Sequence, residues 1–411
     1  MKSDIDALMK EKGIDAILIT GSTNHNPAMV YFTGIRNITH ADYIRTKNGE
    51  STLFHSMIER EEAKSTGLPT KSYMAYSWQR LLEESNCDEI LAYALRYKAM
   101  LAELNITSGR IALYGNTEFG YAYSVINMLR ELIPELEIIP SESTDLMKEL
   151  MFTKSPEEIR CIQKMGQVTV EVVSEIAEFL ISQRTINEFI VNGKGEPITI
   201  GDIKRRINLL LAERDAESSQ GLIFSIGKDA GIPHNCGNNS DMIKMGETII
   251  FDIFPNAIGG GYFFDFTRTW CLGHANDEIL KTYEDVLDVY QKIINMLNID
   301  MAFKDLHSIA CNIFKQKGHE TIQHNPNAEE GYIHSLGHGI GLKIHERPFS
   351  GVNTSEQDIL LPGVVFTIEP GLYYPLSGYG IRLENTIVCN QAGEFEIIAD
   401  YPMDLILPIK S

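Results

Sequence analysis

Two aspartates within an otherwise apolar hairpin constrain this sequence more than any other feature. Residues 248–270 contain two apolar, strand-like runs around a turn rich in Asn and Gly, which is typical of a β-hairpin. Asp252 lies in the first run and Asp265 in the second. A turn centred between Ile258 and Gly259 places the two carboxylates directly opposite each other, where like charges destabilise a sheet. The pair therefore requires protonation, a basic partner or a bound cation.

A second hairpin repeats this arrangement. Residues 364–388 carry Glu369 in one run and Glu384 in the other, and a turn centred between Leu376 and Ser377 places them opposite each other as well. A solvent-facing hairpin with scattered acids is the simpler interpretation of either segment. Because unpaired charges buried in apolar runs are costly, the two hairpins together favour a metal site.

Three histidines lie between the hairpins. Residues 334–348 contain His334, His338 and His345. Four carboxylates and one imidazole supply enough negative charge to balance two divalent cations. An oxygen-rich set with one nitrogen suits manganese, cobalt, iron or zinc better than a metal that prefers thiolates.

The order of these motifs matches a known superfamily. FDIF…YFFDFTRT, HSLGHGIGL, TIEPGLY and GIRLEN place Asp, Asp, His, Glu and Glu in sequence. They resemble the metallopeptidases of the creatinase, prolidase and methionine aminopeptidase superfamily, over about residues 150–411 and more weakly before them. The resemblance implies an α+β fold. A C-terminal pita-bread catalytic metallopeptidase domain, residues 151–411, would follow a smaller creatinase-type α/β domain, residues 1–150.

The resemblance also implies the role of each site residue. It implies two divalent metal ions, manganese or cobalt first and zinc or iron as alternatives. The implied metal ligands are Asp252, Asp265, His338, Glu369 and Glu384, with Asp265 and Glu384 bridging the ions. The implied catalytic residues are Glu369, as general base for the attacking water, and His334 and His345. The implied substrate-binding residues are His234, Tyr373 and Arg382, and Thr267, Arg268 and Thr269 would orient the ligands.

The implied activity is metal-dependent hydrolysis of the N-terminal Xaa-Pro peptide bond by an activated water, as in Xaa-Pro aminopeptidases and Xaa-Pro dipeptidases (prolidases). The additional N-terminal domain favours this branch over the methionine aminopeptidases. The implied partners are small peptides with proline at the second position and a second copy in a homodimer. The sequence leaves open whether the substrates are dipeptides or longer peptides.

Two alternatives come from other classes. One is a non-catalytic pita-bread protein that binds peptides or partners, and the other is creatinase-like hydrolysis of a small amidino compound without metal. The complete set of five metal ligands disfavours both. Two departures from the family pattern affect the substrate: the interval of 13 residues between the aspartates is two longer than usual, and Phe254 replaces a small residue.

Charge and cysteine content indicate which partners and which cellular compartment to expect. Lys and Arg number 36 and Asp and Glu 56, which gives a net charge of −20 and argues against nucleic acid or an anionic membrane as partner. The N-terminus lacks the apolar core of a signal peptide, and no run reaches the roughly 18 apolar residues of a membrane span. The six scattered cysteines fit reduced thiols in a cytoplasmic protein.

Local patterns predict the main elements. In the N-terminal part they predict strands at 15–20, 29–34, 51–56 and 110–115, and helices near 3–12, 57–66, 89–104 and 118–133. In the C-terminal part they predict helices at 156–182, 202–214, 276–297 and 302–317. The first of these begins at a capping box formed by Ser155 and Glu158, with Pro156 between them.

Overall fold

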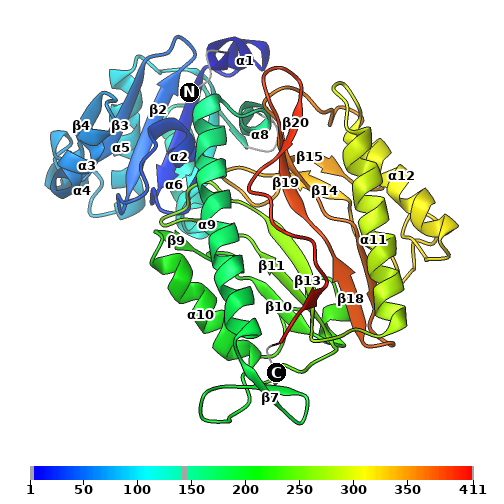
Figure 1. Ribbon diagram of the computed structural model, residues 1–411. Helices are drawn as coiled ribbons and strands as arrows, with labels where there is room; N and C mark the ends of the chain where they lie inside the picture. Colours follow the sequence, from blue (N-terminus) through cyan, green and yellow to red (C-terminus); the bar gives the residue numbers. More distant parts are fainter. Residues whose placement is uncertain (1–3, 141–145, 410–411) are drawn as a thin grey trace. The chain divides into compact units, whose positions relative to one another are not determined.

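The computed structural model describes residues 4–140 and 146–409, and the chain divides into two compact units. The first unit comprises Met1–Leu150 together with Ile258–Gly261, and the second comprises Met151–Ala257 together with Tyr262–Ser411. Each unit combines helices with β-sheets around its own hydrophobic core (Figure 1). The fold is therefore of the expected α+β class.

A six-stranded sheet forms the centre of the first unit. Its strands, in spatial order, are β4 (Thr70–Ser72), β3 (Ser51–His55), β2 (Ala41–Thr46), β1 (Ala16–Gly21), β5 (Gly109–Asn116) and β6 (Leu136–Pro140). The helices are α1 (Ile5–Glu11), α2 (Pro27–Thr33), α3 (Arg60–Ser65), α4 (Trp78–Glu84), α5 (Glu89–Glu103) and α6 (Phe119–Leu132). Strands β1, β5 and β6 are parallel to one another, and apolar residues of α5 and α6 share one core with the sheet.

The prediction of a strand at 29–34 is wrong, because this segment belongs to helix α2. The side-chain oxygen of Asn26 accepts a hydrogen bond from the backbone N–H of Met29 at 3.2 Å, and Pro27 occupies the first turn. Gly34, with a φ of 71°, ends the helix in the left-handed conformation. These caps outweigh the strand preference of the aromatic and β-branched residues between them. The other predicted strands and the four helices of this unit are confirmed.

Strand β2 was not predicted from the sequence. Its six residues are all buried, although Asp42 and Arg45 interrupt the apolar pattern. Asp42 is fully buried and accepts hydrogen bonds from the hydroxyls of Tyr73 and Tyr97, both at 2.7 Å. The tyrosines come from other segments of the chain, so the local sequence does not reveal that the carboxylate has partners.

The second unit consists of two halves, each with a sheet and two long helices (Figure 1). In the first half, β10 (Ile223–Ile226), β11 (Thr248–Ile253), β13 (Phe266–Leu272) and β21 (Ile406–Leu407) accompany α9 (Pro156–Ile181) and α10 (Ile200–Ala212). In the second half, β15 (Glu346–Ser350), β14 (Gly337–Gly339), β16 (Val365–Ile368), β19 (Asn385–Cys389) and β20 (Phe395–Ile397) accompany α11 (Asp277–Met296) and α12 (Phe303–Gln316).

Short paired strands complete this unit. They are β7 (Arg184–Ile186) with β8 (Phe189–Val191), β9 (Ala216–Glu217) with β12 (Asn256–Ala257), and β17 (Gly371–Tyr374) with β18 (Tyr379–Arg382). All four helices predicted for the C-terminal part are confirmed, and so is the capping box of α9 between Ser155 and Glu158. In Figure 1, α9 and α10 lie along one side of the sheets and α11 and α12 along the other.

The predicted register of the first acidic hairpin is wrong by two residues. Asp252 pairs with Thr267, and Asp265 lies just before strand β13. The hairpin continues in this register beyond β11 and β13, since Asn256 forms an antiparallel bridge with Phe263. The turn is therefore centred between Gly259 and Gly260, one residue later than predicted, and this shifts the register by two residues. Part of the connection, β12, also pairs with Ala216 and Glu217 of β9.

The predicted register of the second hairpin is confirmed. Ile368 pairs with Asn385 and Gly371 pairs with Arg382. Glu369 and Glu384 lie between these two pairs, where one ladder ends and the next begins. The side chains of Glu369 and Glu384 therefore start from neighbouring positions in the second half of the unit.

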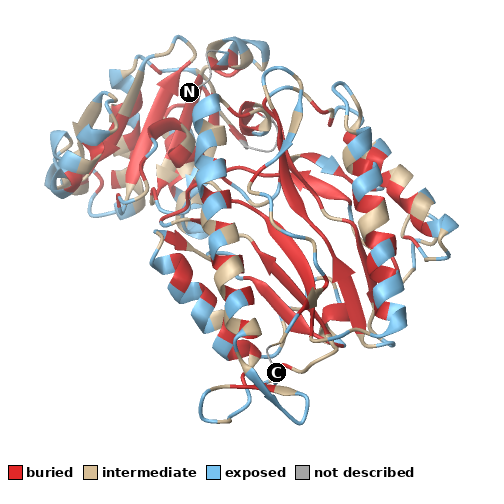
Figure 2. Cartoon of the chain, in the orientation of Figure 1, coloured by how far each residue is buried: buried red, intermediate tan, exposed pale blue. Residues whose placement is uncertain are grey.

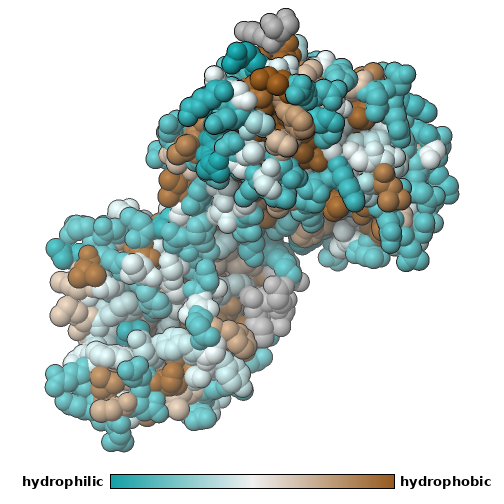
Figure 3. Space-filling view, turned by 90° about the horizontal axis from the view of Figure 1, so that it is seen from below, coloured by the Kyte–Doolittle hydropathy of each residue, from teal (hydrophilic) through white to brown (hydrophobic). Residues whose placement is uncertain are grey.

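Burial follows the layers of both units. The strands are mostly buried, and the long helices expose one stripe of residues while burying another (Figure 2). On the face drawn in Figure 3, hydrophilic residues cover most of the surface, and hydrophobic ones form separate small groups. Among the helices formed by residues 4–140 and 146–409, none is both long enough and apolar enough to cross a membrane.

Candidate metal centre and active site

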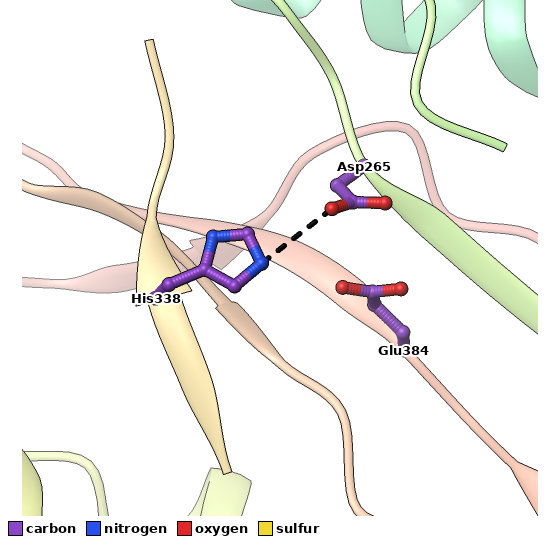
Figure 4. Close-up of side chains that lie close together, drawn as sticks. All are labelled: Asp265, His338 and Glu384. Carbon is purple, nitrogen blue, oxygen red and sulfur yellow. Dashed lines mark ion pairs between the residues drawn. The ribbon is translucent and has the colours of Figure 1, made fainter. Parts of the chain in front are cut away.

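Three potential metal ligands converge from three different strands. Asp265 directly precedes β13, His338 lies in β14, and Glu384 directly precedes β19. All three residues are buried, and each offers one ligand atom within 4.8 Å of the other two. The Nε2 atom of His338 lies 3.6 Å from an Oδ atom of Asp265 (Figure 4). The two halves of the unit thus contribute to one ligand cluster.

The structure places the other two predicted ligands beside this cluster. Glu369 follows β16, and its Oε1 lies 3.5 Å from Nε2 of His338. Asp252, in β11, forms an ion pair with Arg382 at 2.5 Å. All five predicted ligands line one cleft of about 500 Å³.

Backbone contacts orient the imidazole of His338. Its Nδ1 lies 3.1 Å from the carbonyl oxygen of Gly339. A carbonyl can only accept, so Nδ1 carries the proton and Nε2 presents a lone pair to the carboxylates of Asp265 and Glu369. This is how a metal-binding histidine is usually held.

The buried carboxylates of the cluster repel one another and favour binding of a cation. Burial, followed by repulsion from neighbouring carboxylates, raises the pKa of Asp265 and of Glu384 well above the usual value. Burial raises the pKa of Glu369 to about 8. Oδ1 of Asp252 and Oε1 of Glu384 are buried and find no hydrogen-bond partner within the described part of the chain. A donor set of carboxylates and one imidazole with unsatisfied oxygens fits divalent cations.

The residues after Asp265 hold the ligands in place. The hydroxyl of Thr267 donates to an Oε atom of Glu384 at 2.6 Å. The hydroxyl of Thr269 donates to the carbonyl of Arg382 and accepts from its backbone N–H, both at 2.9 Å. Alternate residues of β13 therefore fix the strand that carries Glu384.

A hydrogen-bonded chain fixes His334. Nδ1 of His334 donates to the carbonyl of Ser335 at 2.7 Å, and the hydroxyl of Tyr373 lies 2.9 Å from Nε2. The same hydroxyl accepts from Arg382 at 2.7 Å, so it donates its own proton to His334. Both nitrogens of His334 are thus engaged. Tyr373 is fully buried and reaches the cleft through His334 and Arg382.

The remaining predicted residues lie in the cleft wall. His234, His334, His345 and Arg382 all line the cleft. The ring of His345 packs edge-on against that of His338, with 4.4 Å between centroids. Phe254, the departure from the family pattern, also lines the cleft.

Further lining residues were not recognised from the sequence. They are Gln220, Ile223, Pro233, Cys236, Ser335, Ile344 and Phe349. Ser335 and Ile344 lie within the histidine segment 334–348, and the others come from separate loops and strands that no motif marks. The apolar members give part of the cleft a hydrophobic lining.

Comparison with known structures defines the class of protein first. The fold matches the Xaa-Pro dipeptidase from Bacillus anthracis with a TM-score of 0.76, 22% identity and coverage of 98% of this chain and 97% of the other. It matches the X-Pro aminopeptidase from Thermotoga maritima with a TM-score of 0.75, 22% identity and coverage of 98% and 100%. The fold is the pita-bread fold, preceded by a smaller α/β domain.

The sequence comparisons identify the family. Residues 160–391 match metallopeptidase family M24, and residues 3–149 match the creatinase/prolidase N-terminal domain. The chain therefore belongs to metallopeptidase family M24. The Xaa-Pro dipeptidase of Pyrococcus furiosus is 27% identical over 397 residues, which cover 96% of this chain and 97% of that protein.

Metal removal should make the stability of the protein depend on pH. In the metal-free fold the pKa of Glu369 is raised to about 8, so between about pH 7 and pH 8 the folded chain binds more protons than the unfolded one. Glu369 alone is therefore expected to lower stability by about 1 kcal/mol over this unit of pH. Asp265 and Glu384, whose pKa values are also raised, act in the same direction. His334 and His338, whose pKa values burial lowers to about 3, stay largely neutral here in both states.

Urea unfolding of chelator-treated protein at the two pH values measures this effect. Reloading with Mn²⁺ should remove the pH dependence, because bound cations keep the carboxylates ionised. Glu369→Gln should reduce the slope in the metal-free protein, because Asp265 and Glu384 still titrate. A pH-independent midpoint without metal would contradict the assignment of Glu369 as a buried titrating group.

Proposed function

We propose that this metallopeptidase hydrolyses the N-terminal Xaa-Pro bond of small peptides with two divalent ions bound in the cleft. The observation that carries the proposal is the convergence of Asp252, Asp265, His338, Glu369 and Glu384 on one cleft, with two buried carboxylate oxygens left unsatisfied. The name of the Pyrococcus furiosus relative, an Xaa-Pro dipeptidase, supports the choice of substrate.

The five ligands divide between the two ions as the family resemblance implies. Asp265 and Glu384 would bridge them, while Asp252 and His338 would each bind one. Bound divalent cations lower the pKa of a water molecule and polarise a carbonyl group. Arg382 would hold Asp252 in position through its ion pair. Thr267 would hold Glu384 in the same way through its hydroxyl.

Glu369 is proposed as the general base. Its carboxylate lies in the cleft beside His338, and the hydroxyl of Thr367 donates to it at 3.4 Å. A carboxylate in this position can accept the proton of the attacking water and pass it on. His345 is proposed to donate to the oxygen that gains negative charge, because both nitrogens of His334 are already engaged in this conformation.

The cleft wall supports a substrate with proline in the second position. Ile223, Phe254, Ile344 and Phe349 line it with apolar surface, and a pyrrolidine ring would pack there. Proline also lacks a backbone N–H, so an apolar wall leaves no donor of the substrate unpaired. His234 and Arg382 would contact the polar parts of the peptide.

A direct assay tests this proposal. Protein stripped of metal and reloaded with Mn²⁺ or Co²⁺ is incubated with Ala-Pro, Ala-Pro-Ala and Met-Ala-Ser. We expect metal-dependent release of alanine from the proline peptides and slow cleavage of Met-Ala-Ser. Glu369→Ala should lower the rate about 10²- to 10⁴-fold, the usual contribution of a general base. The ratio of the two proline peptides separates a dipeptidase from an aminopeptidase.

Two outcomes would contradict the proposal in different ways. Metal uptake and peptide binding without cleavage would favour the non-catalytic binding protein. Equal cleavage of the proline peptides and Met-Ala-Ser would leave a peptidase but exclude the Xaa-Pro preference.

The proposal also covers the setting of the enzyme. It includes manganese or cobalt as the ions, a homodimer and a cytoplasmic location. All six cysteines lie within the described part of the chain and none forms a disulfide, which suits a reducing compartment. Light scattering on the purified protein tests the homodimer, and elemental analysis of protein purified without added metal tests the ions.

A further inference from the structure

The first unit contains a second pocket of about 510 Å³, separate from the cleft. It lies between helix α6 and the sheet, at the carboxyl ends of the parallel strands β1 and β5. Its lining residues are Leu18, Thr20, Tyr97, Leu113, Tyr114, Gly115, Thr117, Phe119, Tyr121, Ala122, Tyr123, Val125, Ile126 and Ile138. Small-molecule sites have volumes of this order, and in open α/β sheets they occur at this edge.

The pocket is deep rather than a flat apolar face. Leu18 and Val125 at its floor are 0% and 2% exposed. Phe119 and Tyr123 at its mouth are 83% and 62% exposed, and their rings stack at 6.3 Å between centroids. Large aromatic side chains held in solvent at the entrance of a hollow indicate a binding surface.

The residues that line the pocket favour an uncharged ligand. Among the lining residues, all from the described part of the chain, none is an Asp, Glu, Lys, Arg or His, and five are aromatic. A charged ligand would lose its hydration there without gaining a partner. Flat, uncharged rings would instead stack on the aromatic side chains.

The hydroxyl of Thr20, at the pocket floor, can make a directed polar contact with a ligand. The hydroxyl of Tyr97 donates to Asp42 at 2.7 Å, and Oγ1 of Thr20 lies 2.9 Å from the same hydroxyl. Burial, followed by the charge of Asp42, raises the pKa of Tyr97 well above its usual value, so the phenol keeps its proton. Because that proton points to Asp42, Thr20 is the donor to Tyr97. The lone pairs of Thr20 Oγ1 remain available as acceptors.

We propose that this pocket binds a small, uncharged aromatic molecule that carries one hydrogen-bond donor, such as an indole or phenol ring, with Thr20 as the acceptor. The site is independent of the peptidase proposal, because none of its residues belongs to the cleft. A ligand in this pocket would bind to the first unit, which carries none of the proposed catalytic residues.

Calorimetric titration of the full chain with indole tests the proposal, with 1-methylindole as the matched probe that lacks the donor. We expect one indole per chain. Thr20→Val should weaken indole binding about two- to tenfold, the value of one neutral hydrogen bond, and leave 1-methylindole unchanged. Ala122→Phe should fill the pocket and abolish binding of both probes.

Matched variants separate binding from folding. Thr46→Val makes the same change in the same sheet outside the pocket, and Ala102→Phe adds a ring to the exposed face of α5. Both should bind indole like the unaltered chain. Glu369→Ala should also bind indole normally, so the failure of one proposal does not affect the other.

Three results would overturn the inference. The first is absence of indole binding, and the second is binding that Ala122→Phe leaves intact. The third is that Phe119→Ser changes the molecular mass of the protein in solution while neither probe binds. That result would assign the aromatic mouth of the pocket to contact with a second copy. Equal affinity for both probes in every variant would overturn the role of Thr20.

Discussion

Replacing Asp265 by asparagine is expected to remove bound metal and to lower kcat/KM on the order of 10³-fold. Asp265 is one of the three residues whose ligand atoms lie within 4.8 Å of one another. Asparagine keeps the shape of the side chain but removes the negative charge that a bridging ligand supplies. Because bound cations contribute several kcal/mol to stabilisation of the transition state, their loss has an effect of this size.

The stability of the same variant separates loss of metal from misfolding. The pKa of Asp265 is raised by burial and then by the charges of Asp252 and Glu369, so the carboxylate is unfavourable in the metal-free fold. Metal-free Asp265→Asn should therefore unfold at the same temperature as the metal-free parent, or higher. Elemental analysis after dialysis measures the metal content, with the exposed Asp305→Asn as control. Full metal content and activity in Asp265→Asn would exclude Asp265 as a ligand.

Replacing Arg268 by lysine is expected to destabilise the second unit by about 3–5 kcal/mol, the cost of disrupting a buried charged network. Arg268 is fully buried, and all five of its N–H groups have acceptors. The acceptors are the carbonyls of Thr267, Glu384, Tyr401 and Pro402 and the side-chain oxygen of Asn385, at 2.7–3.0 Å. The guanidinium also lies 4.1 Å from the ring of Phe266.

Lysine cannot replace this group. Its ammonium has three donors on a flexible stem, so at least two buried acceptors would lose their partner. The guanidinium joins β13 to the backbone at Glu384, so the loss should also lower metal affinity. Urea unfolding measures the effect, with Arg205→Lys as the matched control, because the side chain of Arg205 is 71% exposed and pairs with nearby Asp202. A change below about 1 kcal/mol for Arg268→Lys would contradict the assigned network.

Local signals in the sequence predicted the helices well. The capping box of Ser155 and Glu158 starts α9 at the expected residue, since both partners of a cap lie within one turn of the chain. Local signals failed where partners are distant. The six-residue strand β2 contains Asp42, whose hydroxyl partners Tyr73 and Tyr97 lie 31 and 55 residues away.

The ligand set shows the same division. The order of two aspartates, a histidine and two glutamates in apolar strands indicated metal chemistry, because carboxylates buried together need a cation. Their geometry did not follow from spacing. The register of Asp252 depends on a turn centred between Gly259 and Gly260, one residue later than predicted, in a run of three glycines that does not mark a single centre.

The sequence by itself determined the long capped helices, since caps and periodicity act over a few residues. Its ordered motifs, through the family resemblance, indicated the α+β class and the candidate metal ligands. Only the tertiary structure decided which atoms face the cleft. It turned Nε2 of His338 toward the carboxylates, engaged both nitrogens of His334, and placed Tyr373 behind the wall. It also enclosed the aromatic pocket of the first unit. These features arise from packing between segments far apart in the chain, where the partner of each group is set by the fold.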